Sequence, residues 1–424
     1  MEFKEIELRE TTIEIIDGDR GKNYPKKTEM KDIGHTLFLN NKNIINDYLD
    51  ISKGEYISEE KSSLLRKGKL ERNDLVMSTR GSVGNIGYFS EKIEWDHIRI
   101  NSGMVILRNR DSKIDTEYLY FLLKSPLMKE RYKELISGSV QNQLPIRDLQ
   151  RVKLIYPEVH KQKQIVKLIG SLENKIQLNK KVINNLEEIS QTLFKHWFID
   201  FEFPNEQGHP YKSSSGEMVE SELGEIPKEW KVGTASNLFD FSPTEKLSKG
   251  ALVKYLEMKD LQNSAMIYQY TDREFKSGSK FRNGDTLLAR ITPCLENGKI
   301  GFVDFLDKDE VGWGSTEFIV IRTKPEISKT FSYFFAADSA FKDYAIINMN
   351  GSSGRQRVKA ETLAQYKIAI PPLQLIKQFT DIADANMRMM TNLKLQINKL
   401  EKLRDTLIPK LLSGEIEIPD ELEV

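Results

Sequence analysis

Cysteine is almost missing from this sequence of 424 residues, in which Cys294 is the one example. A single cysteine excludes an internal disulfide and a cysteine-rich zinc site, and it indicates a reducing, cytoplasmic compartment. Long apolar runs are missing too, since no stretch approaches the roughly 18 consecutive apolar residues of a membrane span. The N-terminal MEFKEIELRE has no apolar core, so no secretory signal is expected. We therefore expect a cytoplasmic protein without a membrane partner.

Catalytic motifs are also missing. The sequence has no G-x-x-x-x-G-K-[ST] phosphate loop and no Asn-Pro-Pro-aromatic tetrapeptide of an adenine methyltransferase. We expect no enzymatic activity, no cofactor and no metal in this chain. The histidines are scattered without metal-ligand spacing: His35, His97, His160, His196 and His209.

Net charge is absent as well, because 63 Lys and Arg residues balance 63 Asp and Glu residues. Such a chain does not coat DNA by bulk charge. It permits DNA binding only where basic side chains gather on one face and acidic ones lie elsewhere. The argument for function therefore depends on how the sequence is organised.

What the sequence does contain is a repeat of two halves. VKLIYPEVHKQKQI around Pro157 matches YKIAIPPLQLIKQF around Pro371, 214 residues later. The glycine-led segments at Gly138 and Gly351 lie 213 residues apart, and the segments around Asp74 and Asp285 lie 211 apart. The small drift indicates loop insertions within one shared plan. Each half runs from short β-rich segments, through a proline boundary, to a long helical pattern.

The two helical patterns share a heptad register, which is typical of a coiled coil. We infer that the helices pair with each other, although periodicity does not give their direction. Two ordinary amphipathic helices on separate cores are the alternative. The first seam is Ile165, Ile169, Leu172, Ile176, Asn179, Ile183, Leu186, Ser190 and Leu193. The second seam is Phe379, Ala383, Asn386, Met390, Leu393, Ile397, Leu400, Arg404 and Leu407.

These features divide the chain into five predicted parts. Two are globular domains, at 1–157 and 230–371, and two are coiled-coil helices, at 158–200 and 372–424. Residues 201–229, rich in Gly, Pro and Ser, are expected to form a surface linker.

The order of these parts resembles that of type I restriction-modification specificity subunits. NKKVINNLEEISQTLFKHWFIDFEFP and LEKLRDTLIPKLLSGEIEI are similar to the central and C-terminal conserved regions of that family. GDTLLARITPCLENGKI and LGEIPKEW are similar to segments of its target-recognition domains. The resemblance implies an α+β protein in which two α/β domains are separated by an antiparallel intramolecular coiled coil with pseudo-two-fold symmetry.

The resemblance also implies a role and partners. Each domain reads half of a bipartite, asymmetric site in double-stranded DNA. Two methyltransferase subunits, which bind S-adenosylmethionine, dock on the helices, and ATP-using restriction subunits join them. The first seam covers 29 residues, or roughly 43 Å of helix. Since a DNA turn is about 34–36 Å, we expect the helices to set the spacer between half-sites. A coiled-coil adaptor or an orphan protein without DNA reading is the alternative.

Candidate DNA-contacting residues lie in two repeated loops and at two strand ends. Arg and Lys read guanine in the major groove, Asn and Gln read adenine, and short polar groups position phosphates. The alternatives to DNA contact are solvated turns for the loops and, for Arg290, an ion pair inside its domain. The loop candidates are Ser139, Gln141, Asn142 and Gln143, then Ser352, Ser353, Arg355, Gln356 and Arg357. The strand-end candidates are Arg80, Ser82 and Asn85, then Arg290, Thr292, Asn297 and Lys299.

Overall fold

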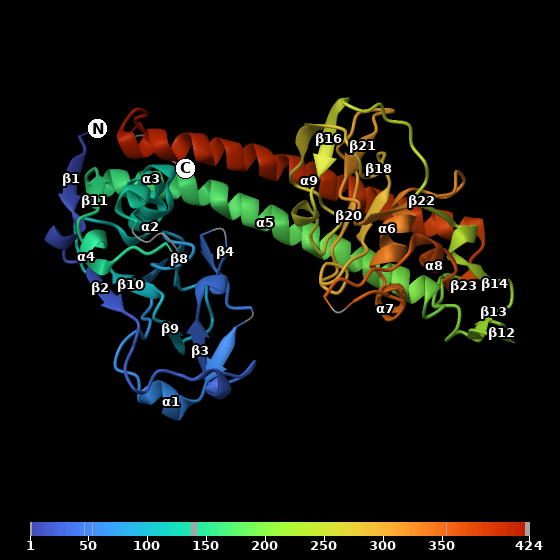
Figure 1. Ribbon diagram of the computed structural model, residues 1–424, viewed down its shortest axis with the longest axis horizontal. Helices are drawn as coiled ribbons and strands as arrows, with labels where there is room; N and C mark the ends of the chain where they lie inside the picture. Colours follow the sequence, from blue (N-terminus) through green and yellow to red (C-terminus); the bar gives the residue numbers. More distant parts are fainter. Residues whose placement is uncertain (1, 46, 53, 137–141, 353, 420–424) are drawn as a thin grey trace. The chain divides into compact units, whose positions relative to one another are not determined.

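The computed structural model describes residues 2–45, 47–52, 54–136, 142–352 and 354–419. The chain forms two compact units: a first unit of Met1–Asn174 with Glu401–Val424, and a second unit of Lys175–Leu400. The long helices α5 (Val159–Phe198) and α9 (Leu373–Ser413) each contribute to both units (Figure 1). The sequence predicts that each long helix lies outside the globular domains, whereas the boundary between the compact units divides both helices. The predicted domain bounds therefore stay a prediction.

The first unit combines short, mainly antiparallel sheets with a few helices, and β3 and β9 pair in parallel. Its strands follow the orders β1-β11, β2-β10-β7-β8, β6-β3-β9 and β4-β5. The strands are β1 (Lys4–Glu7), β2 (Glu14–Asp17), β3 (Thr36–Leu39), β4 (Ile44–Ile45), β5 (Tyr48–Leu49), β6 (Glu55–Ile57), β7 (Leu75–Ser78), β8 (Ile86–Tyr88), β9 (Ile98–Ile100), β10 (Met104–Arg108) and β11 (Lys153–Tyr156). The shorter helices are α1 (Glu59–Ser63), α2 (Thr116–Lys124), α3 (Pro126–Leu135) and α4 (Ile146–Leu149).

The second unit repeats this plan. Its sheets follow the orders β14-β23, β15-β22-β19-β20 and β17-β16-β21-β18, with an extra hairpin β12-β13. The strands are β12 (Met218–Ser221), β13 (Gly224–Pro227), β14 (Lys231–Thr234), β15 (Phe239–Phe241), β16 (Leu252–Leu256), β17 (Thr271–Glu274), β18 (Ser279–Phe281), β19 (Thr286–Ala289), β20 (Ile300–Phe302), β21 (Gly312–Gly314), β22 (Phe318–Thr323) and β23 (Lys367–Ile370). The shorter helices are α6 (Thr330–Ala337), α7 (Ser339–Ile347) and α8 (Ala360–Ala364).

The central four-stranded sheet of each unit is buried on both faces. In β10, Val105 and Leu107 join one apolar cluster with α2 and α5, while Met104 and Ile106 join another with β3 and β9. Successive side chains of a strand point to opposite faces, so a continuous apolar run fits a strand covered on both sides. The sheet therefore lies between a helical layer and a second small sheet.

A buried arginine–aspartate pair braces the central sheet in both units. In the first unit, Arg108 donates from Nε and Nη2 to Asp74, each at 2.9 Å. In the second unit, Arg322 makes the corresponding bonds to Asp285, each at 2.7 Å. The two aspartates lie 211 residues apart and the arginines 214 apart, so the sequence repeat is also a structural repeat.

Within each unit the portions of α5 and α9 run antiparallel (Figure 1). In the second unit, Asn179 Nδ2 donates to Gln396 at 3.3 Å, and Asn386 Nδ2 donates to Ser190 at 3.0 Å. The partner number in α9 falls as the number in α5 rises, which defines the direction. No predicted seam residue is exposed. The predicted fold class, including the antiparallel coiled coil and the repeat, is confirmed.

The segment expected to be a surface linker carries structure of its own. It contains the hairpin β12-β13, and the Phe203 ring stacks on both Tyr211 and Trp230. Gly, Pro and Ser suggested an open chain, but the aromatic residues beside them anchor it to the second unit. In the described part of the chain, no helix is both long and apolar enough to cross a bilayer.

Candidate nucleic-acid interface

The two sets of candidate residues meet in both units, where the loop is fastened to the strand end by backbone hydrogen bonds. In the first unit, Leu144 N donates to Thr79 O at 2.9 Å and Gly81 N donates to Asn142 O at 3.1 Å. In the second unit, Val358 N donates to Arg290 O at 3.0 Å and Thr292 N donates to Gln356 O at 3.1 Å. The same two bonds thus place the same loop beside the same strand end in each domain.

A third shared bond joins this strand end to the residue that precedes the central strand. Thr79 N donates to Gly103 O at 2.8 Å, and Arg290 N donates to Glu317 O at 3.0 Å. Together the three bonds define which residues correspond. Gln143 corresponds to Arg357, and Gly103 corresponds to Glu317.

We call these three backbone hydrogen bonds the clamp. In the second unit the clamp brings two charged side chains together. Arg357 donates from Nε to the Glu317 carboxylate at 2.9 Å and from Nη2 at 2.7 Å. These hydrogen bonds raise the pKa of Arg357, which therefore stays cationic. The Arg290 side chain lies close to the same strand end, and its buried Nε has no hydrogen-bond partner among the described residues.

In the first unit the clamp gathers a different set of side chains. Arg80 and Gln143 lie opposite each other as a bridge between the strand end and the loop. Asn41 Nδ2 donates to Arg80 O at 2.5 Å. Among the described residues, the Nε of Arg80 and the Oδ1 of Asn41 are buried without a hydrogen-bond partner. Such buried polar atoms are usually paired in folded proteins, which sets these two apart from most of the domain.

Several predicted residues also make hydrogen bonds within their own domain. Lys299 Nζ donates to Met258 O at 2.8 Å, so its charge ties two segments of the domain together. Thr292 Oγ1 accepts from Gln356 N at 3.1 Å, and Asn297 N donates to Pro293 O at 2.9 Å. In the first unit, the carbonyl oxygens of Ser82 and Asn85 accept hydrogen bonds from Ser78.

Of the remaining loop candidates, Ser352 O accepts from Arg355 N at 3.0 Å in an exposed turn. The predicted residues Ser139, Gln141 and Ser353 lie outside the described residues.

Two residues of the interface were not predicted from the sequence. Glu317 contacts Arg357, and Asn41 contacts Arg80. The repeat held a signal for Glu317, because the 214-residue offset places it at the position of Gly103, where an acidic residue replaces glycine. Asn41 lies 39 residues before Arg80 in another segment, and no local pattern connects them.

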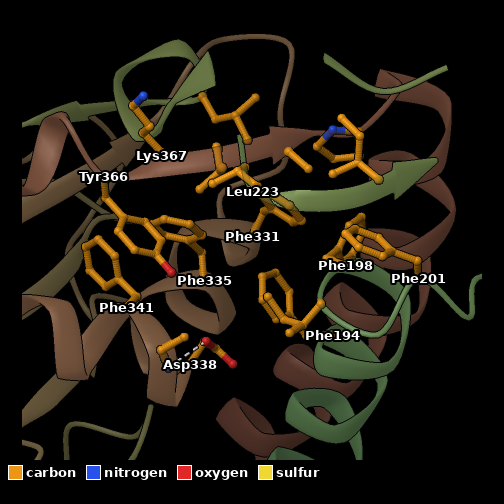
Figure 2. Close-up of a pocket in the computed structure, with 17 residues that line it drawn as sticks. Phe194, Phe198, Phe201, Leu223, Phe331, Phe335, Asp338, Phe341, Tyr366 and Lys367 are labelled. Atoms are coloured by element: carbon orange, nitrogen blue, oxygen red, sulfur yellow. Dashed lines mark hydrogen bonds between the residues drawn. The ribbon is translucent and has the colours of Figure 1, made fainter. Parts of the chain in front are cut away.

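A separate pocket in the second unit does not belong to this interface (Figure 2). Its cavity of about 250 Å³ has a mainly apolar lining, which includes the aromatic side chains of Phe194, Phe331 and Phe341 from α5, α6 and α7. Asp338 is the acidic residue in the lining, and its carboxylate accepts from Ala340 N at 2.9 Å as the N-cap of α7. None of the predicted DNA-contacting residues lines it.

The clamped loops carry side chains of the kinds that can pair with base edges. A guanidinium can donate two hydrogen bonds to guanine O6 and N7, and a glutamine amide can pair with adenine N6 and N7. The chain therefore carries two copies of one polar surface, with different side chains at corresponding positions. This defines a repeated module rather than a single active site.

The comparison with known families agrees with this architecture. The family described as "Type I restriction modification DNA specificity domain" matches residues 10–188 and 227–402. These two matches cover most of the chain, and each coincides with one copy of the repeat. The chain therefore belongs to this family and contains two of its domains.

Relatives and a solved structure extend the likeness along the chain. The MjaIX specificity subunit of Methanocaldococcus jannaschii is 22% identical over 389 residues, covering 88% of this chain and 85% of the relative. The HindI specificity subunit of Haemophilus influenzae is 21% identical, covering 94% and 98%. A crystal structure of a type I restriction-modification S subunit from M. genitalium has a TM-score of 0.53 at 15% identity, covering 97% and 96%. At that identity the structural match supports the fold alone.

Proposed function

We propose that this chain reads a bipartite double-stranded DNA site and performs no catalysis itself. Each domain contacts one half-site through its clamped loop and strand end. The observation that carries the proposal is the clamp, because the same three backbone hydrogen bonds position different side chains in the two domains. Two equivalent reading surfaces with different chemistry suit a DNA target with two different halves.

The long helices supply the second part of the proposal. They hold the half-sites at a fixed spacing and dock two methyltransferase subunits, which bring S-adenosylmethionine. Restriction subunits that use ATP complete the assembly. The support is the continuous length of α5 and α9, together with membership in the specificity family.

Reconstitution tests the proposal directly. The purified chain alone should transfer no methyl groups to DNA from S-adenosylmethionine. Adding the methyltransferase subunit of its own system should give methylation at one split motif, identified by methylation-sensitive sequencing of a random duplex library. Robust methylation by the chain alone would contradict the non-catalytic role. A complex that forms without any DNA preference would favour the adaptor alternative.

Replacing both Arg355 and Arg357 with alanine should affect one half-site only. Arg355 is exposed on the loop, and Arg357 is held by Glu317. Losing a bidentate contact to guanine removes about 1–3 kcal/mol of base discrimination. The same library, methylated by the variant complex, should keep the sequence of the first half-site and relax the second. An equal change in both half-sites, or in neither, would refute the loop assignment.

A further inference from the structure

Two corresponding positions differ between the domains, and they differ together. The loop position holds Gln143 in the first domain and Arg357 in the second, while the strand position, directly before β10 or β22, holds Gly103 or Glu317. The domain with arginine on its loop thus has a carboxylate beside it. The domain with glutamine has glycine, which offers no side chain there.

Glu317 accepts hydrogen bonds from one edge of the Arg357 guanidinium, formed by Nε and Nη2. Nε lies 3.0 and 2.9 Å from the two carboxylate oxygens, and Nη2 lies 2.7 Å from Oε1. Nη1 donates to Arg355 O at 3.3 Å. By the donor inventory of a guanidinium, an N–H still remains on each terminal nitrogen. Since the side chain is 41% exposed, these remaining donors are accessible to an external acceptor pair.

The carboxylate is itself fixed by the domain. Glu317 N donates to Ser315 Oγ at 3.1 Å, and Glu317 O accepts from Arg290 N. The side chain of Glu317 is only 23% exposed. A long arginine side chain is flexible in solution, and holding it in one orientation before binding reduces the entropy lost on contact. The domain therefore fixes the orientation of the Arg357 guanidinium edge that has free N–H groups.

We infer that these paired positions determine one base in each half-site, an adenine read by Gln143 and a guanine read by Arg357 with Glu317 as its positioning residue. This inference rests on the proposed function. The two bases occupy corresponding places, because the same backbone bonds fix both loop positions. Arginine pairs with guanine O6 and N7, whereas the neutral amide of glutamine pairs with adenine N6 and N7. The amide has no charge to be balanced, which agrees with a glycine at its strand position.

Exchanging the pairs between domains tests the inference. The first variant combines Arg357→Gln with Glu317→Gly, and the second combines Gln143→Arg with Gly103→Glu. The second exchange is sterically reasonable, since Gly103 has no left-handed φ. A Cβ built there would meet Asn101 Oδ1 at 3.3 Å and Arg80 Cβ at 3.8 Å. The contact at 3.3 Å requires only a small shift of the Asn101 side chain.

The readout is the motif methylated by the reconstituted complex in duplexes randomised over both half-sites. The first variant should change one guanine of the second half-site to adenine, by about 5- to 150-fold in preference, and leave the first half-site unchanged. The second variant should make the reverse change in the first half-site. Unchanged preferences, or changes spread over several positions, would overturn the inference. A wild-type complex without any split motif would instead contradict the proposed function.

Glu317→Gln supplies a test that does not depend on the exchanged pairs folding. It keeps the size of the side chain and removes the charge, so the guanine preference should fall several-fold without a gain of adenine. In the Arg357→Gln background the same change should have no further effect on base preference. The matched control is Arg273→Gln, which breaks an exposed ion pair with Glu257 in the same domain and should leave the recognised bases unchanged. A guanine preference that survives Glu317→Gln rules out the positioning role.

Discussion

Four residues inserted in both long helices should lengthen the DNA spacer by one or two base pairs. Four helical residues add about 6 Å of rise, and base pairs are stacked at about 3.4 Å. The insertions belong after Lys175 in α5 and after Leu400 in α9. The contacts Asn179–Gln396 and Glu173–Arg404 flank these points, so the two insertions lie opposite each other. They also fall at the boundary between the two compact units.

The measurement is methylation of a duplex series in which only the spacer length varies. A four-residue insertion is a coiled-coil stutter, which is accommodated by local unwinding, so both half-site sequences should persist. The control is the insertion in α5 alone, which shifts one seam against the other and should abolish methylation at every spacer length. If the double insertion methylates the original spacer as well as before, the helices do not set the spacing.

Replacing Arg322 with methionine should destabilise the second unit by about 3–5 kcal/mol, the usual cost of breaking a buried ion pair. Arg322 joins Asp285 to Glu245, whose Oε1 lies 2.6 Å from Nη1. The side chains of these acids are only 2% and 5% exposed, so the substitution leaves carboxylates without this partner in a poorly hydrated place. Chemical denaturation followed by tryptophan fluorescence measures the loss, since Trp230 and Trp313 lie in this unit.

The same substitution should raise the pH of acid unfolding. Burial opposes ionisation of Glu245, but hydrogen bonds and charges from Arg282 and Arg322 outweigh burial and keep its pKa below the ordinary value. A lowered carboxylate pKa contributes stability above the unfolded-state pKa, about 4.3, and that stability is lost as pH falls through the folded-state value. Lys228→Met, which removes an exposed pair with Glu217, should change neither measurement appreciably. Equal stabilities of the Arg322 variant and the wild type would show that the pair does not brace the sheet.

The repeat and the heptad seams could be predicted from the sequence because both are periodic. Spacing alone does not give the direction of the helices, since a heptad pattern suits either orientation. Direction follows from pairs such as Asn386 and Ser190, which lie 196 residues apart. These polar seam residues satisfy one another, a contact that no alignment of the two halves indicates.

The sequence predicts which loops carry candidate DNA-contacting residues, but not which other residues contact their side chains. Polar, glycine-flanked segments pointed to residues such as Gln143 and Arg357, whereas Glu317 depends on how strand and loop come together in the fold. The arginines that end the two matching segments also occupy different backbone positions. Thr79, not Arg80, corresponds to Arg290, because the same carbonyl bond defines each.

The two halves are similar overall, but corresponding buried positions can hold a polar residue in one half and an apolar residue in the other. Gln162 is fully buried, where its amide donates to Lys113 O at 2.7 Å and Pro157 O at 2.8 Å and accepts from Asp115 N at 2.7 Å. In the second half its place is taken by Ile376, which packs in the apolar cluster. Hydrogen bonds in one copy are thus replaced by hydrophobic contact in the other, so the residue has a structural role in its own domain.

The first unit is built from two stretches of chain that are far apart in the sequence, and this affects how it folds during synthesis on the ribosome. The second unit is continuous in sequence, from Lys175 to Leu400, whereas the first unit requires Glu401 onward. Ile408, Leu411 and Leu412 complete an apolar cluster with Ile165 and Ile169, and Lys161 donates to Ile418 O at 2.9 Å. Domains generally fold as their residues emerge, but the first unit cannot close its core until the C-terminal part of α9, from Glu401 onward, has left the exit tunnel. The order of synthesis and the order of completion are therefore reversed.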